Sequence, residues 1–392
     1  MAKIKVIQIL EATIGGTRTH LNYLTKYLNK ELFELTVICS AKRDESFVHD
    51  LKKMETMGIQ IYQIDLYRQV HIWKDLISML QIYKILKNKK YDIVHTHAGK
   101  AGLVGRIAAV IAGIKKIYHT PHGFAYNRYT KNIMNLLVTL TEKILSIFTT
   151  RLICVSESES KYAISKVKIN YRKIIIIPNA VKTTKSLRDT NYTRYTGLQQ
   201  LKEKMGIYNG SKVVGTVGYF RPQKDYITLI QSINMVLKIN KNIQFLFIGD
   251  GEGKAEIESL ISLYNIENHI IMTGYIPFKK MKSYYLMMDL YLSTSLWEGM
   301  SYSILEAMSY GIPVIATDVD GNADIINHTV NGLLVPKKDA QKTAITVLKV
   351  LNNCAIRNVL SNNAKVLISD KYLIKDNISK YEQLYQNRYS EI

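Results

Sequence analysis

The stretch IKVIQILEATIGGTRTHLNYL, residues 4–24, contains the pattern that decides the fold. Residues 5–10 form a short apolar run typical of a buried strand, and leucines then recur at helical spacing. Gly15 and Gly16 separate the two patterns, and glycine permits both a tight turn and close backbone approach. The stretch therefore predicts a strand, a glycine loop and a helix in succession.

The same alternation of short apolar runs and longer helical patterns continues along the chain, as in parallel sheets covered by helices. Residues 182–212 interrupt it with polar and turn-forming residues, so we expect a linker there that leads into a second domain. We predict strands at residues 5–10, 35–40, 60–64, 93–96, 116–120, 151–155, 174–178, 213–218, 244–248, 270–273, 290–293, 314–316 and 333–335.

This pattern indicates an α/β protein with two doubly wound domains, residues 1–181 and 182–371. Sheets of this type bind ligands beyond the carboxyl ends of their strands. Functional residues are therefore expected immediately after the predicted strands.

Two charged motifs follow predicted strands in the second domain. Arg221 and Lys224 stand three residues apart, a spacing suited to gripping one diphosphate. The stretch WEGMSYSILEAM, residues 297–308, places Glu298 before a glycine turn and Glu306 within the following helix. Carboxylates accept hydrogen bonds from sugar hydroxyls, and a helix N-terminus suits phosphate. Together these motifs favour a nucleotide-sugar site.

These motifs, with others at strand ends, resemble the family 4 glycosyltransferases of the GT-B fold, including bacterial capsular and exopolysaccharide enzymes. The resemblance covers nearly the whole chain. It implies two Rossmann-like domains facing a central cleft, with a last helix, residues 372–392, packed on the first domain. The motifs that carry it are Gly15-Gly16, residues 218–224, the Glu298-x7-Glu306 spacing, GIPVIA at 311–316 with Gly321, DIVHTH at 92–97, TPHG at 120–123, CVSE at 154–157 and IPN at 177–179.

The resemblance implies retaining transfer of a sugar from a nucleotide diphosphate, with no metal and no cofactor. We expect a UDP-sugar as donor and a polyprenyl-diphosphate-linked saccharide as acceptor, in the synthesis of a surface polysaccharide. The implied catalytic residues are Glu298, His122, Arg221 and Lys224. The implied donor-binding residues are Gly15, Gly16, Arg221, Lys224, Gly274, Tyr275, Glu298, Gly299, Met300, Ser301, Tyr302 and Glu306.

Positive charge is concentrated in the first half of the chain. Of 53 Lys and Arg against 32 Asp and Glu, residues 1–180 hold 28 and 13, so +15 of the net +21 lies there. Such a surface fits an anionic membrane, with Arg128, Lys131, Trp73 and Lys74 as candidate contacts. We favour the membrane over a merely solvated lysine surface, and we expect no nucleic acid as a partner.

The sequence also indicates where the protein resides. No apolar run reaches the roughly 18 to 20 residues of a membrane-spanning helix, and the first residues do not resemble a signal peptide. Three cysteines without metal-like spacing fit a reducing compartment. We expect a cytoplasmic protein bound peripherally to the inner face of the cell membrane.

Several rival interpretations remain open. A nucleotide-sugar epimerase of the same fold and a non-catalytic scaffold of a polysaccharide assembly complex are the alternatives to transfer. Asp318-x-Asp320 resembles a metal-binding pattern, and residues 249–253 superficially resemble a dinucleotide loop. The several histidines of the first half are expected to be packed or hydrogen-bonded rather than metal-bound.

Overall fold

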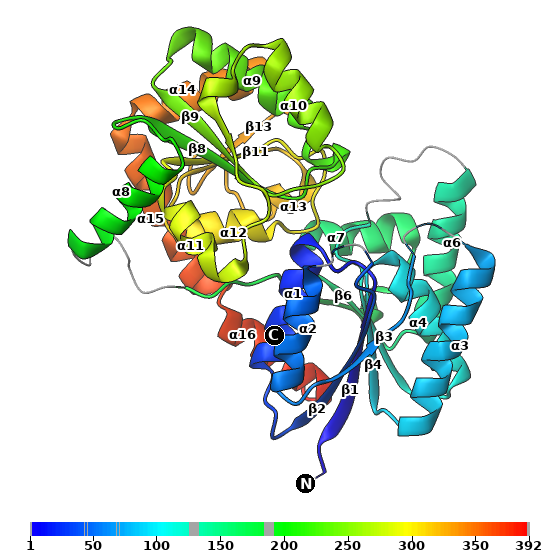
Figure 1. Ribbon diagram of the computed structural model, residues 1–392. Coiled ribbons are helices and arrows are strands. Elements are labelled where there is room, and N and C mark those ends of the chain that lie inside the picture. The colour runs from blue at the N-terminus through cyan, green and yellow to red at the C-terminus, as the bar shows by residue number, and fades with distance from the viewer. Residues whose placement is uncertain are drawn as a thin grey trace. The chain divides into compact units, whose positions relative to one another are not determined.

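The computed structural model describes residues 2–42, 44, 46–67, 69, 71–124, 133–183 and 192–389 (Figure 1). The chain divides into two compact units. The first comprises residues 1–179 and 374–392, and the second comprises residues 180–373.

The first unit is a seven-stranded parallel sheet in the order β3-β2-β1-β4-β5-β6-β7. Every strand predicted in this half is present. Its strands are β1 (Ile4–Leu10), β2 (Phe33–Cys39), β3 (Gln60–Gln63), β4 (Ile93–His97), β5 (Lys116–Thr120), β6 (Arg151–Cys154) and β7 (Ile174–Ile176). Its helices are α1 (Gly15–Tyr27), α2 (Phe47–Thr56), α3 (Ile72–Lys89), α4 (Gly99–Ile111), α6 (Ile133–Phe148), α7 (Glu157–Tyr162) and α16 (Ile374–Tyr385), with short turns at Ala163–Val167 and Tyr171–Lys173.

The second unit is a six-stranded parallel sheet in the order β10-β9-β8-β11-β12-β13, and all six predicted strands are present. The strands are β8 (Lys212–Val217), β9 (Ile243–Ile248), β10 (Ile270–Met272), β11 (Leu290–Ser293), β12 (Val314–Thr317) and β13 (Leu333–Val335). The helices are α8 (Tyr192–Lys204), α9 (Tyr226–Ile239), α10 (Lys254–Leu263), α11 (Phe278–Leu286), α12 (Tyr302–Ser309), α13 (Asp320–Ala323), α14 (Ala340–Asn352) and α15 (Cys354–Lys371), with short turns at Pro222–Lys224 and Glu267–His269.

The sheets are buried because helices cover them. β9 is buried at every position, as its continuous apolar run predicts for a parallel strand covered on both faces. In each unit the strand order reverses beside the first strand of the sheet, between β1 and β4 and between β8 and β11. The predicted ligand-binding loops follow these strands.

The last helix, α16, belongs to the core of the first unit although it is last in sequence. Tyr381 and Tyr385 are fully buried in a cluster with residues of β1 and β2. The Tyr385 hydroxyl accepts a hydrogen bond from Gln8 Nε2 at 3.0 Å and shares another with His95 Nδ1 at 2.7 Å. The helix thus packs on the sheet, and its contact with His95 joins residues 290 positions apart in sequence.

One expectation about the linker was wrong, because its second half forms helix α8. This helix is polar along most of its length, so it lacks the apolar periodicity that identifies a helix in sequence. Arg128 and Lys131, which we predicted to contact a membrane, lie outside the described residues. None of the described helices combines the length and apolar content needed to cross a bilayer.

The buried hydroxyl of Tyr385 gives a test of this core. Tyr385→Ala should lower the free energy of unfolding by about 3 to 5 kcal/mol because it leaves a cavity. Tyr385→Phe should cost about 1 to 3 kcal/mol because it leaves the Gln8 and His95 side chains without this partner. Urea denaturation followed by circular dichroism measures both effects. Tyr171→Phe, at a side chain that is 64% exposed, is the control; equal stability of all three variants would contradict the packing of α16.

Candidate functional site

The loop after β8 positions the two predicted cations. Arg221 precedes the short turn that ends at Lys224. The next residue, Asp225, caps α9 by accepting hydrogen bonds from the Thr228 amide at 3.3 Å and the Thr228 hydroxyl at 2.7 Å. The cationic residues are therefore held between a strand end and a capped helix.

The glycine-rich loop after β9 packs directly on this cationic loop. A Cβ atom at Gly249 would lie 1.9 Å from the carbonyl oxygen of Gly218, so no other residue fits there. The Phe220 amide donates to the Asp250 carbonyl, and the Gly253 amide donates to the Phe220 carbonyl, both at 2.9 Å. Close backbone packing thus explains the glycines of residues 249–253 without a dinucleotide.

The implied donor-binding residues Gly274 and Tyr275 lie beside this loop. The Gly249 amide donates to the Gly274 carbonyl at 3.0 Å, and Gly274 has a left-handed backbone with φ of 67°. Tyr275 follows with its side chain 48% exposed. The structure therefore places Gly274 next to the loop that supports Arg221 and Lys224.

Lys224 and Glu298 form an ion pair in the interior of the second unit. Lys224 Nζ lies 2.6 Å from Glu298 Oε1, and the two side chains are 15% and 10% exposed. The Ser295 hydroxyl donates to the same oxygen at 2.7 Å. Burial alone would raise the pKa of Glu298, but Lys224, Ser295 and Arg221 together lower it below its usual value. Glu298 is thus held as a carboxylate.

The turn after Glu298 leads into α12. Gly321 packs against this turn, because a Cβ at Gly321 would lie 2.4 Å from the Gly299 carbonyl oxygen. Ser301 is the residue before the helix, and its side chain makes no hydrogen bond to the helix amides. Met300 and Tyr302 are buried on either side of it.

Glu306 lies within α12 and is held by a tyrosine that the sequence did not indicate. The Tyr285 hydroxyl donates to Glu306 Oε2 at 2.8 Å. Burial raises the pKa of Glu306 to about 7, although the hydrogen bond from Tyr285 acts to lower it. Both carboxylates, Glu298 and Glu306, help to raise the pKa of Tyr291, after the larger effect of burial. The two predicted acids therefore both lie close enough to affect Tyr291, a residue of β11.

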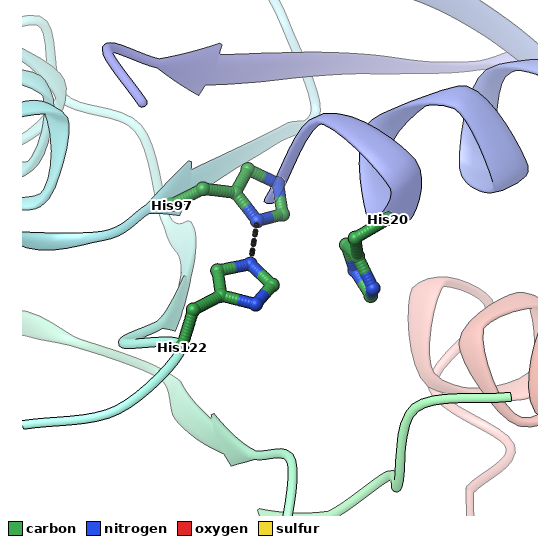
Figure 2. Close-up of side chains that lie close together, drawn as sticks. All are labelled: His20, His97 and His122. Atoms are coloured by element: carbon green, nitrogen blue, oxygen red, sulfur yellow. Dashed lines mark hydrogen bonds between the residues drawn. The ribbon is translucent and has the colours of Figure 1, made fainter. Parts of the chain in front are cut away.

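In the first unit the glycine loop after β1 forms as predicted. Gly15 has a left-handed φ of 59°, and α1 begins there, so Gly15 and Gly16 are exposed at the first turn of the helix. Farther along α1, His20 points toward His97 from the end of β4 and His122 from the loop after β5 (Figure 2). The three imidazoles come from three separate elements.

A chain of hydrogen bonds fixes the proton positions in this histidine cluster. Gln8 donates through Nε2 to Tyr385, so its Oε1 accepts the hydrogen bond from His97 Nε2 at 2.7 Å. His97 Nδ1 is then the acceptor for His122 Nε2 at 3.1 Å (Figure 2). Burial holds the pKa of His97 and of His122 well below the usual value, so both are neutral. His122 therefore keeps Nδ1 as an acceptor.

The same cluster is the group of described residues whose geometry could hold a metal ion. One nitrogen from each of His20, His97 and His122 lies within 4.8 Å of the others. Burial lowers the pKa of His20 to about 3, and neutral imidazole is the form that binds metals. The hydrogen bond between His97 and His122 already accounts for their proximity, and the absence of a metal requirement stays a prediction.

Glu159 positions His122 and was missed in the sequence. Its carboxylate accepts hydrogen bonds from the Gly123 amide and, at 2.7 Å, from the Val155 amide. His122 has a left-handed φ of 55°, which is uncommon for a residue with a side chain. The signal was available, because Ser156 caps α7 and the Ser156-x-x-Glu159 spacing is typical of a helix start.

The remaining predicted residues lie at the start of α3. Trp73 is 77% exposed, and Lys74 Nζ lies 4.3 Å from the centre of the Tyr67 ring. Both side chains are therefore at the surface of the first unit, where we predicted membrane contact.

Comparison with known proteins agrees with this arrangement. The sequence model of Glycosyltransferase Family 4 matches residues 14–185, and that of Glycosyl transferases group 1 matches residues 199–367. The chain is a glycosyltransferase with a Glycosyltransferase Family 4 domain followed by a Glycosyl transferases group 1 domain. Each matched range falls on one of the two sheets.

Named relatives cover nearly the whole glycosyltransferase. It is 29% identical over 393 residues to the UDP-Gal:alpha-D-GlcNAc-diphosphoundecaprenol alpha-1,3-galactosyltransferase of Escherichia coli, across 98% of this chain and 97% of that protein. It is 25% identical to the capsular polysaccharide biosynthesis glycosyltransferase CapM of Staphylococcus aureus, across 92% and 91% of the two chains.

Solved structures agree on the fold of the glycosyltransferase. Anabaena HepE, solved in complex with UDP and glucose, superposes with a TM-score of 0.82 at 19% identity, covering 98% of this chain and all of that one. A glycosyltransferase from Rickettsia africae gives a TM-score of 0.77 at 18% identity, over 99% of both chains. The predicted GT-B fold is confirmed.

The raised pKa of Glu306 makes the stability of the glycosyltransferase depend on pH. Because the folded state holds this proton more tightly than the unfolded chain does, the stabilising contribution is complete below the usual value of 4.5 and is lost as pH rises to about 7. One pKa unit corresponds to about 1.4 kcal/mol. Between about pH 5 and pH 8, the melting temperature of wild type should therefore fall relative to that of Glu306→Gln. If the melting temperatures of the two proteins instead change in parallel across this pH range, Glu306 titrates with its usual pKa.

Proposed function

We propose that this glycosyltransferase transfers a sugar, with retention and without a metal, from a UDP-sugar to a polyprenyl-diphosphate-linked saccharide during surface polysaccharide synthesis. The observation that carries the proposal is the buried pair of Lys224 and Glu298, with Arg221 beside it, at the carboxyl ends of β8 and β11. It supplies a cation for a diphosphate and an ionised acid for a sugar at one place.

The donor half of the proposal rests on charge and hydrogen-bonding capacity. Arg221 and Lys224 are suited to a diphosphate because two fixed cations can share its oxygens. Glu306 offers a carboxylate to the paired ribose hydroxyls, and the open first turn of α12 suits a phosphate. UDP as the nucleotide is supported by the name of the Escherichia coli relative and by the UDP and UDP-glucose complexes of HepE.

The proposed reaction breaks the bond between the anomeric carbon and the diphosphate oxygen. Arg221 and Lys224 stabilise the negative charge that develops on the departing diphosphate, while the Glu298 carboxylate stabilises positive charge at the anomeric carbon. The acceptor hydroxyl forms the new bond on the same face of the sugar, and its proton passes to the departing phosphate oxygen. No separate base is needed.

In the first unit we assign the sugar contact to His122. Because His122 is neutral and donates through Nε2 to His97, its Nδ1 can accept a hydrogen bond from a sugar hydroxyl. Gly15 and Gly16 expose the amides at the start of α1, which suits a phosphate oxygen. These roles complete the donor set that the resemblance implies.

The acceptor half of the proposal places the enzyme on the inner face of the cell membrane, in the cytoplasm. The Escherichia coli relative is named for a diphosphoundecaprenol-linked acceptor. The +15 charge of residues 1–180 fits an anionic lipid surface, for which Trp73 and Lys74 are exposed contacts. Arg128 and Lys131 are proposed contacts on the basis of the sequence alone.

Three substitutions test the donor site. Arg221→Ala, Lys224→Ala and Glu306→Ala should each lower kcat/KM by about 10² to 10³, because each removes a polar side chain assigned to the donor. The readout is release of nucleoside diphosphate in the presence of a lipid-diphosphate saccharide.

The matched control is Lys212→Ala, which removes a half-exposed lysine paired with Asp289 at 3.1 Å at the other end of β8. This variant should turn over like wild type. Wild-type activity in the three site variants would refute the assigned donor site.

A donor screen tests the function itself. The purified protein is given UDP-, GDP- and ADP-sugars with a lipid-diphosphate saccharide, and the lipid product is analysed by mass spectrometry. We expect transfer from a UDP-sugar alone. Epimerisation of the donor without transfer would replace the proposal by the epimerase alternative, and no turnover with any donor would favour the scaffold alternative.

A further inference from the structure

Helix α6 buries Glu142 and Ser146 while exposing most of its large apolar side chains. On the inner face, Arg106 from α4 is 1% exposed and binds both oxygens of Glu142 at 2.7 and 2.8 Å. Ser146 is buried on the same face, and Thr149 is buried just after the helix. A helix of an ordinary soluble protein has the opposite distribution.

The outer face of α6 is a row of large apolar side chains. Six of them are between 44% and 67% exposed, and Lys143 lies exposed among them. Soluble proteins rarely expose an apolar surface of this kind without a binding partner. The six are Leu136, Leu137, Leu140, Ile144, Ile147 and Phe148.

The apolar surface extends beyond α6. A groove of about 310 Å³ lies between α4 and α6, and Thr141 is the single polar residue among those that line it. Helix α3 packs on α4 from the other side and exposes Ile72, Trp73 and Ile77 by 56% to 78%. Helices α3, α4 and α6 lie on the same side of the sheet (Figure 1).

The surrounding charge points to an anionic partner. Residues 133–183 contain eight Lys and Arg against three Asp and Glu, and two of these acids, Glu142 and Glu159, are buried. Lys173 Nζ binds the carbonyl oxygens of Ser146 at 2.7 Å and Ile147 at 2.6 Å, so a cation sits at the C-terminal end of α6. An apolar strip with Lys143 among its side chains and Lys173 at its end matches the acyl region and headgroups of an anionic bilayer.

We infer that the outer face of α6, with the groove beside α4 and the exposed start of α3, is the surface that inserts into the cytoplasmic leaflet. With 16 residues and one apolar face, α6 is suited to lie in the plane of the membrane rather than to cross it. This inference rests on the proposed function for its purpose, because a lipid-linked acceptor is presented at that surface. The main membrane contact is then α6 rather than Arg128, Lys131, Trp73 and Lys74, which the sequence suggested.

Vesicle binding tests the surface independently of catalysis. Leu140→Glu with Ile147→Glu should weaken binding to phosphatidylglycerol vesicles at least tenfold in a flotation assay, while the melting temperature stays at the wild-type value. The matched control is Ile239→Glu with Leu263→Glu, which changes two side chains that are 73% and 69% exposed in the second unit. This control should bind vesicles like wild type. Equal loss in both double variants, or in neither, would overturn the inference.

Depth and oligomeric state separate insertion from other uses of the surface. In Phe148→Trp with Trp73→Phe, brominated lipids should quench the tryptophan at position 148 more than Trp297, and no preferential quenching would contradict insertion. If wild type sediments as a dimer that Leu140→Glu with Ile147→Glu dissociates, the surface is instead an interface between two copies of this chain.

Activity assays distinguish failure of the surface from failure of the proposed function. Leu140→Glu with Ile147→Glu should lose transfer to an acceptor in vesicles at least tenfold and keep wild-type transfer to a short-chain, water-soluble acceptor. If wild type binds vesicles but transfers no sugar, the proposed function is refuted and the inferred membrane surface stands. Transfer by wild type with unimpaired vesicle binding by the variant would refute the surface alone.

Discussion

The reversal of strand order between β1 and β4, and again between β8 and β11, is the constraint on which the rest of this structure depends. At such a point the chain leaves adjacent parallel strands in opposite directions, and the carboxyl ends of the strands are left uncovered. In the first unit this exposes the turn at Gly15 and brings His97 toward His20. In the second unit it brings the loop after β8 against the loop after β11, so that Lys224 meets Glu298 across 74 residues of sequence. The candidate residues are therefore consequences of topology as much as of local sequence.

The pairing of Lys224 with Glu298 affects how substitutions of either residue are interpreted. Each side chain neutralises the other in a largely buried position. Removal of one leaves an uncompensated buried charge, which is more destabilising than the intact pair is stabilising. Loss of activity in a single variant thus combines a missing contact with a disturbed partner, and only a comparison of both single variants with the double variant separates the two effects.

Local signals in the sequence predicted all thirteen strands and placed the site loops after them, because a buried parallel strand is a short apolar run whatever surrounds it. Such signals could not predict two features. Helix α8 has no apolar stripe to reveal it. Helix α6 buries Glu142 against Arg106 of α4, and this contact leaves its leucines on the exposed face. At the site, the residue types were predictable from motifs, whereas the partners Tyr285, Gln8 and Tyr385 come from distant segments and are set by packing. Glu159 lies between these cases, since its spacing from Ser156 was visible but its hold on the loop of His122 was not.

The return of α16 to the first sheet also determines the order in which the protein can be completed during synthesis. Tyr381 and Tyr385 are translated after the whole second unit, yet they fill the core that β1 and β2 require. The second unit is continuous in sequence and can fold as soon as it emerges, whereas the first must wait for helix α16. Until then its apolar surface is available to chaperones, and a stop codon shortly before residue 374 would leave unfinished the half of the protein that was translated first.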